Sequence, residues 1–212
     1  MATTLNAGTS TSGAAISADT SGILQLQSGS TPTTAMTIDA SQVVTFANPI
    51  KGGAITSGTA QATTSGTSID FTGIPSWVKR ITVMFMGVSV SGTSIPVIKL
   101  GTSSGIESTT YLGTAGGGNA ANLNSVSQMS VGFNLIDVGD AAVTFQGRIE
   151  ISLGNLSTNT WCANGTLGNG NTTTCFWMGG TKSLSGTLDR IRLTTVNGTD
   201  TFDAGSVNIL YE

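Results

Sequence analysis

The N-terminal stretch of this chain carries its apolar side chains as short doublets at alternate positions, and this spacing limits what it can form. The doublets are Leu24 with Leu26, Met36 with Ile38, and Val44 with Phe46. Alternation of this kind indicates strands, and the turn-forming residues at 27–32 and 39–42 keep each strand very short. A single chain with so little apolar surface cannot offset the conformational entropy that ordering it would cost.

Two outcomes remain for residues 1–53: disorder as a linker, or partnership with other copies of the chain. The repeated doublets favour partnership, because repeat units bury their apolar faces only against neighbours. We therefore expect an extended oligomerisation and attachment stem that assembles as a homotrimer. Pro49 and the pair Gly52-Gly53 mark its end, because both residue types terminate strands.

Residues 54–212 carry longer alternating segments. The clearest runs from Val78 to Val90, where Ile81, Val83 and Phe85 alternate with other residues. Further strands are expected at 68–71, 96–100, 128–135, 142–153, 174–178, 190–195 and 206–211. Their brevity and the Gly-rich turns between them predict an all-β chain with almost no helix, in which residues 54–212 form an antiparallel jelly-roll-like β-sandwich head.

Charge narrows the classes of partner. Charged residues make up 9% of the chain and the formal charge is −3. The few basic residues form no stripe that could neutralise phosphates, so we expect no nucleic-acid binding. The basic residues at 79–80, Arg190 and Arg192 are interpreted as the solvent face of two strands, with an anionic-ligand site as the alternative. No apolar run approaches the roughly 20 residues of a membrane span, and residues 1–12 lack the pattern of a secretory signal. We expect synthesis in a host cytoplasm and no membrane insertion.

The chain contains no histidine, which removes the commonest general base and every Ser-His or Cys-His arrangement. The carboxylates that remain as candidates are Asp137, Asp140, Glu150, Asp200 and Asp203. Both aspartate pairs lie in expected turns, where Asp accepts backbone N–H bonds, and neither has the ligand count of a calcium site. Gly116-Gly117-Gly118 is expected to be a flexible loop, since no Lys-Ser/Thr follows it. We expect no catalytic residue, no metal and no cofactor.

Cys162 and Cys175 flank a polar loop and each is next to an aromatic residue. If the two flanks pair about Gly168-Asn169, the cysteines face each other, and this register would permit a disulfide. The alternative is a pair of reduced cysteines packed as small hydrophobes.

Three aromatic side chains are candidates for stacking on sugar rings, because each offers a flat apolar face with a polar edge. They are Trp161, Trp177 and Tyr111. Packing in the core is the competing interpretation for the two tryptophans, and burial is expected for Trp77 beside the strand that begins at Val78.

Two parts of the sequence resemble proteins of tailed bacteriophages. Residues Thr4–Ser10, Asp19–Gly29 and Ala35–Gln42 are similar to a module that recurs in tail-fibre and other virion proteins. Residues Phe71–Val83 and Thr201–Glu212 resemble a C-terminal β-domain of phage fibre and prophage proteins. Together these stretches cover about half of the chain, and the resemblance implies no catalytic residues.

The resemblance implies a structural, non-enzymatic virion protein, exposed on the particle surface as a trimeric tail-fibre-like appendage. Its stem would bind other virion proteins and its head would contact host-surface polysaccharide. In related proteins the N-terminal module repeats or follows a long anchor, whereas here it occurs once at the start. That difference favours a short appendage or, as the alternative, a capsid decoration or head-fibre protein. A polysaccharide-degrading enzyme is the third hypothesis.

Overall fold

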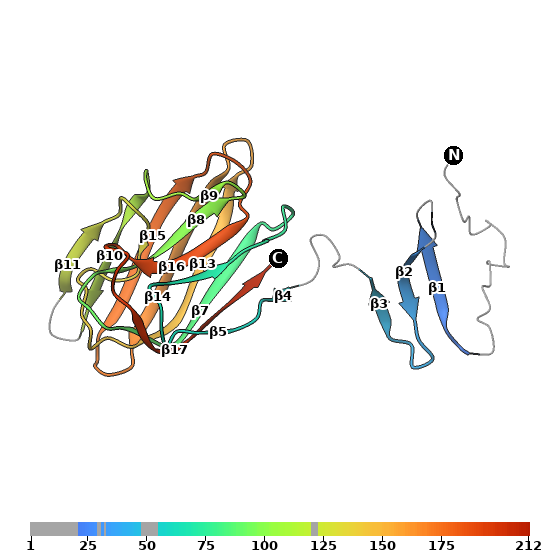
Figure 1. Ribbon diagram of the computed structural model, residues 1–212, viewed down its shortest axis with the longest axis horizontal. Helices are drawn as coiled ribbons and strands as arrows, with labels where there is room; N and C mark the ends of the chain where they lie inside the picture. The colour runs from blue at the N-terminus through green and yellow to red at the C-terminus, as the bar shows by residue number, and fades with distance from the viewer. Residues whose placement is uncertain (1–20, 29–30, 32, 48–54, 120–122) are drawn as a thin grey trace. The chain divides into compact units, whose positions relative to one another are not determined.

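A computed structural model describes residues 21–28, 31, 33–47, 55–119 and 123–212, and every regular element in these ranges is a β-strand (Figure 1). The chain divides into two compact units, Met1–Ile50 and Lys51–Glu212. The expected all-β class with almost no helix is confirmed for these ranges. The expected stem boundary after residue 53 falls in the stretch 48–54, which lies outside the described residues.

The N-terminal unit contains a three-stranded antiparallel sheet. Its strands are β1 (Leu24–Ser28), β2 (Thr33–Ile38) and β3 (Val44–Phe46), in that order. The register aligns the doublets in two rows, with Leu24, Ile38 and Val44 in one and Leu26, Met36 and Phe46 in the other. The Asp39 carboxylate closes the β2–β3 turn by accepting the backbone N–H groups of Ser41 and Val43. The three short strands expected from the doublets are confirmed.

The C-terminal unit is an antiparallel sandwich of two sheets (Figure 1). The larger sheet has nine strands, in the order β11-β10-β15-β14-β13-β7-β17-β4, with β5 also paired to β17. Their bounds are β4 (Thr56–Ser57), β5 (Gln61–Ala62), β7 (Arg80–Val90), β10 (Leu112–Gly118), β11 (Leu123–Gln128), β13 (Phe145–Asn155), β14 (Thr160–Asn169), β15 (Cys175–Ser183) and β17 (Phe202–Tyr211).

The smaller sheet has five strands, in the order β12-β8-β16-β6, with β9 also paired to β8. Their bounds are β6 (Ser68–Phe71), β8 (Pro96–Thr102), β9 (Gly105–Ile106), β12 (Phe133–Asn134) and β16 (Arg190–Thr195). In β16, Ile191 and Leu193 are buried while Arg190 and Arg192 face outward. Buried and exposed side chains alternate along such strands, and the core lies between the inner faces of the two sheets.

The expected head is confirmed as an antiparallel β-sandwich, and two local expectations are wrong. Residues 128–135 do not form one strand, because Gln128 ends β11, which pairs with β10, and Phe133–Asn134 pairs separately with β8. Gly116-Gly117-Gly118 is not a loop but the end of β10, paired with β15. Aromatic side chains of β15 explain why glycines occur in this strand. A Cβ on Gly116 would lie 2.9 Å from Nε1 of Trp177, so the ring of Trp177 occupies the space that a side chain at 116 would need.

A bulge shared by β7 and β17 bends this part of the nine-stranded sheet. Gly87 and Gly205 both have positive φ, at 67° and 87°. The register between the two strands shifts between Ala204 and Ser206. A side chain on Gly205 would overlap the carbonyl oxygen of Gly87, so glycine is required both by the backbone conformation and by the close approach of the two strands.

Candidate functional site

The three aromatic residues expected to contact a glycan differ in their exposure to solvent. Tyr111 is 1% exposed and Trp161 is 3% exposed, so both belong to the core and neither offers a ring to a ligand. The expectation of a glycan contact is wrong for Tyr111 and Trp161, because both rings are buried in the hydrophobic core of the sandwich. Trp177 is 40% exposed on the outer face of the nine-stranded sheet and keeps a ring accessible to a ligand. Trp77, expected to be buried, is half-buried and packs against Tyr211.

Tyr111 is held in place by a buried polar cluster. Its hydroxyl accepts the N–H of Leu100 at 2.7 Å and donates to the carbonyl oxygen of Glu107 at 3.0 Å. Burial, partly offset by the Leu100 hydrogen bond, raises the pKa of the phenol well above its ordinary value. The ammonium of Lys182 lies 5.4 Å from the ring centroid and 2.6 Å from the Glu107 carboxylate. These contacts describe a structural brace and not a ligand site.

The cysteine hairpin has a different register from the one expected. Cys162 pairs with Thr181, and Cys175 pairs with Gly168. The chain turns between Asn169 and Thr174, where the two residues are joined by a backbone hydrogen bond. Six residues therefore separate Cys175 from the position opposite Cys162, a distance of about 20 Å along a strand. That is far beyond disulfide reach, and both cysteines are free and exposed. The expected register, and with it the disulfide within one chain, is wrong.

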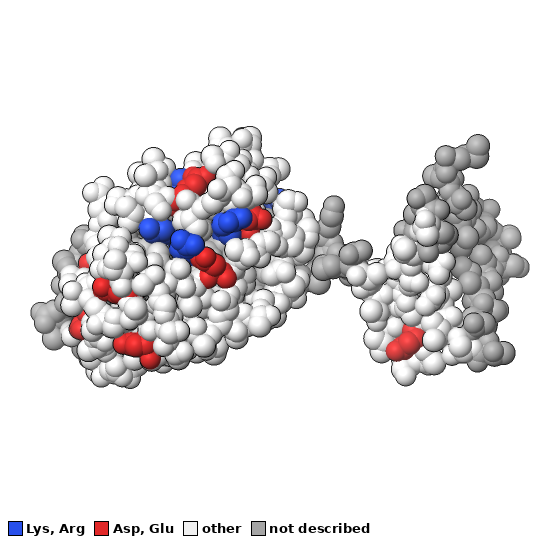
Figure 2. All heavy atoms as spheres, in the orientation of Figure 1, with Lys and Arg blue, Asp and Glu red and all other residues white. Residues whose placement is uncertain are grey.

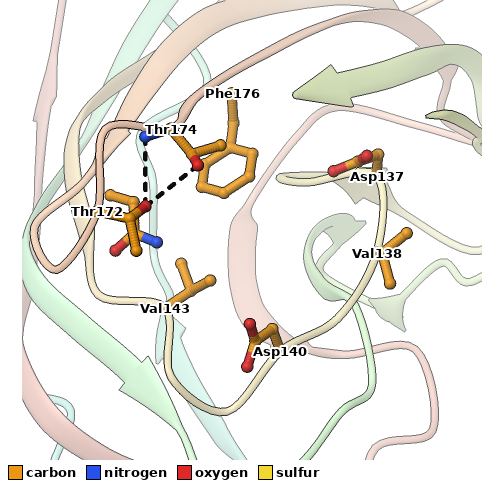
Figure 3. A pocket seen from close by; sticks show the side chains of 8 residues that line it. Asp137, Val138, Asp140, Val143, Thr172, Thr174 and Phe176 are labelled. Carbon is orange, nitrogen blue, oxygen red and sulfur yellow. Dashed lines mark hydrogen bonds between the residues drawn. The ribbon is translucent and has the colours of Figure 1, made fainter. Parts of the chain in front are cut away.

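Asp137 and Asp140 contribute to a polar hollow of about 420 Å³. Figure 3 shows both carboxyl groups turned toward the hollow, with Thr172 and Thr174 on its other side. Asp140 also accepts the N–H of Ala142 at 2.8 Å, as a turn aspartate does. Within the described ranges, no three His, Cys, Asp or Glu side chains gather as metal ligands. The hollow offers hydrogen bonds to a small polar ligand.

Asp200 acts as a clamp for the loop that follows β16. Its carboxylate accepts the N–H of Ser94 and a side-chain N–H of Asn197, both at 2.8 Å. These hydrogen bonds, first that of Asn197 and then that of Ser94, lower the pKa of Asp200. Asp203 lies in β17 with its side chain exposed. The structure therefore does not bring this aspartate pair together in one hollow.

The N-terminal sheet has an apolar face that remains partly exposed among the residues that the structure describes. All six doublet residues lie on one side of it, because their positions alternate and the register matches them across the strands. Leu26 and Val44 are each 48% exposed and Phe46 is 45% exposed. No described residue of the unit whose burial is defined is buried. A sheet with no buried side chain lacks the hydrophobic burial that stabilises small sheets in water.

No comparison with known proteins identifies a relative. No protein-family model matches the chain, and no curated protein or solved structure does either. The parts of the chain that the structure describes contain no helix with the length and apolar character needed to cross a membrane.

Only part of a basic cluster on the five-stranded sheet could be predicted from the sequence. The sequence pattern indicates Arg190 and Arg192 as basic residues on the solvent face of a strand, but it does not indicate Lys99. The structure places Lys99 opposite Arg192 in the neighbouring strand. No local pattern around residue 99 could have revealed this, because the pairing depends on the register between two strands that are distant in sequence.

Proposed function

We propose that this chain is a non-enzymatic structural protein of a tailed-bacteriophage particle, a trimeric tail-fibre-like appendage exposed on the virion. The observation that carries the proposal is the apolar face of the N-terminal sheet, which no described residue buries, in a chain whose C-terminal sandwich has a core of its own. The sequence resemblance of both parts to phage fibre proteins supports the same class.

The apolar face favours assembly with further copies of the chain. Burying the exposed part of Leu26, Val44 or Phe46 would contribute about 1 kcal/mol each, roughly half the value of a full side chain. In an assembly each contribution is repeated in every copy. Homo-oligomers generally close by rotational symmetry, and three copies around an axis can all direct this face inward.

The mass of the purified full chain tests the assembly. Light scattering should give three times the 21.3 kDa of one chain. Urea at concentrations too low to unfold the sandwich should dissociate the trimer first, because the N-terminal sheet has no core of its own. A single-chain mass at every concentration would contradict the trimeric appendage.

A capsid decoration or head-fibre protein is the second candidate. Both candidates use the same stem, and they differ in how many copies a particle carries. A quantitative gel of purified particles separates them, because a decoration protein covers the shell in many more copies than a tail appendage.

The head is the part we propose to face outward and to contact the polysaccharide of a host surface. Most polar side chains of the protein carry hydroxyl or amide groups, since charged residues make up only 9% of the chain. Such a surface can exchange hydrogen bonds with sugar hydroxyls without desolvating many ions. Trp177 is the aromatic residue among the three candidates whose ring is accessible for stacking.

A further inference from the structure

Basic side chains gather on the outer face of the five-stranded sheet. Arg192 of β16 pairs with Asp70 of β6 on one side and with Lys99 of β8 on the other. Arg190 lies two residues before Arg192 and so projects from the same face. The three cations line a hollow of about 440 Å³, here called the basic hollow. Figure 2 shows basic and acidic side chains gathered over β8, β9 and β16.

Backbone packing shapes one wall of this hollow. A Cβ on Gly101 would lie 2.9 Å from Cγ of Arg190 and would overlap the carbonyl oxygen of Gly105. The absence of a side chain there lets Arg190 lie close to the sheet, where its guanidinium donates to the carbonyl oxygen of Ser103 at 3.2 Å. The Asp189 carboxylate holds the same guanidinium at 2.9 Å from Nε. Arg190 is thus fixed in position without a ligand.

The charges in the basic hollow do not balance. Arg192 makes two parallel hydrogen bonds to Asp70, both at 2.7 Å, and Arg190 is paired with Asp189. Among the described residues, no hydrogen bond or ion pair is made by the ammonium group of Lys99. Three cations and two carboxylates leave one net positive charge, in a chain whose formal charge is −3.

This arrangement disfavours the charged form of Lys99. Burial, and then the neighbouring Arg192, lower the pKa of its ammonium. The ammonium of Lys99 therefore lies in an unfavourable position for a positive charge, and unfavourable local arrangements are more frequent at functional sites. An anion placed beside Lys99 and Arg192 would remove the conflict. It would also find N–H groups of Arg192 that Asp70 leaves unused, because a guanidinium has five.

We propose that the basic hollow binds the carboxylate of an acidic sugar unit in an anionic polysaccharide. The net charge of one matches a single carboxylate. Thr67, Ser68 and Ser108 supply hydroxyl groups around the cations, and Ile106 supplies an apolar contact. Sugars present this same combination of hydroxyl groups and small apolar patches. The volume lies in the range of about 300–1,000 Å³ that is usual for small-ligand sites.

Nucleic acid fits this surface less well than an acidic glycan. Affinity for nucleic acid grows with the number of phosphates that a protein neutralises, and one net positive charge neutralises only one. None of the lining residues is an aromatic side chain on which a base could stack. The inference deepens the proposed glycan contact of the head and rests on it for the class of ligand, while binding by the purified chain can be measured without a virus particle.

The test is a titration of the full chain with trigalacturonate, a carboxylated trisaccharide, followed by backbone amide chemical shifts. We expect saturable shifts at Ser68, Ser108 and the β8–β9 turn, and none with neutral maltotriose. Lys99→Met should weaken binding about tenfold or more, since it removes a charge-assisted hydrogen bond. Lys79→Met is the matched control, because Lys79 is exposed and outside the hollow, and it should bind within about twofold of the unaltered chain.

Each alternative outcome overturns the proposal. They are no binding of trigalacturonate, shifts outside the hollow, equal binding of maltotriose, tighter binding of a single-stranded oligonucleotide, and equal losses from Lys99→Met and Lys79→Met. If Lys99→Met fails to fold, Lys99→Gln replaces it, and the location of the shifts in the unaltered chain still decides. Failure of this test leaves trimer formation untouched, because the stem is measured separately by mass.

Discussion

Breaking the buried ion pair between Lys182 and Glu107 should cost more stability than a typical single substitution. The Lys182 side chain is 2% exposed, whereas that of Glu107 is 21% exposed. The Glu107 carboxylate also accepts the N–H and the hydroxyl of Ser185, at 2.9 and 2.7 Å. Glu107→Gln keeps the shape of the side chain but leaves a buried ammonium without its counter-charge.

The expected loss is about 3–5 kcal/mol, the cost of leaving one charge of a buried pair uncompensated. The lower end applies here, because Thr110 still accepts a hydrogen bond from Lys182 at 3.1 Å and the Tyr111 ring remains nearby. For a domain of this size the loss corresponds to a decrease of about 6–20 °C in melting temperature. Lys182→Met should cost less, since Glu107 keeps its Ser185 contacts and some water.

Urea unfolding of the unaltered chain, both single variants and the double variant forms a thermodynamic cycle. The double variant should lose much less than the sum of the single losses, because neither charge is then left alone. A loss below about 1 kcal/mol for Glu107→Gln, or additive losses, would refute the reasoning by showing that the pair behaves like an exposed one.

The same pair predicts a pH dependence. Burial opposes the charge on Glu107, but the hydrogen bonds from Lys182 and Ser185 outweigh it and hold the pKa of this carboxyl below its ordinary value. Its contribution to stability is therefore present above the unfolded value of about 4.3 and is lost as the pH falls through the folded value. The stability difference between the unaltered chain and Glu107→Gln should shrink in acid, and a constant difference down to strongly acidic pH would contradict this assignment.

Three further outcomes are expected. A thiol reagent should label both Cys162 and Cys175 in the folded protein under air, and an intact mass lower by two hydrogens without labelling would disprove the register. Gly205→Ala should lower the free energy of unfolding in urea by about 2 kcal/mol or more. Gly198 has a similar φ but open space around it, so Gly198→Ala should lower it by only about 1 kcal/mol. Equal losses of stability would show that the bulge is not close-packed. Phe46→Ser should weaken assembly at least tenfold in dilution experiments while leaving the unfolding of the sandwich unchanged, and undiminished assembly would mean that the exposed face is not the contact.

Sequence reasoning succeeded where side chains alternate over several residues. β7 is the clearest example, since Ile81, Val83 and Phe85 point into the core and their neighbours do not. The short strands of the N-terminal sheet followed from the doublets for the same reason. In both cases the periodicity of the backbone appears directly in the order of residue types.

Reasoning from the sequence failed where a contact between distant strands decides the outcome. β10 ends in three glycines, a pattern typical of a loop, but the rings of Trp177 and Phe176 pack against Gly116 and Gly117. The turn of the cysteine hairpin lies beyond Gly168-Asn169, because β14 continues to Asn169 while paired with β13. The glycine and asparagine at 168–169 favour a turn locally, but the pairing of β14 with both β13 and β15 keeps these residues in the strand.

The candidate site was hidden for a related reason. Lys99, Arg190 and Arg192 are each ordinary on an exposed strand, and only the register of β8 with β16 gives them a common hollow. Burial was equally invisible for Tyr111 and Trp161, since an aromatic residue beside a polar loop can face inward or outward. The sequence contains the identity of these residues but not the direction of their side chains.

Hydrogen exchange of the N-terminal sheet tests the central claim most directly. The amides of β1 to β3 should exchange fast at concentrations where light scattering detects single chains, and should become protected as the trimer forms. The amides of β7 and β13 should be protected equally under both conditions, because the sandwich has its own core. Protection of β1 to β3 in single chains would contradict the account, since the sheet would then be stable without partners.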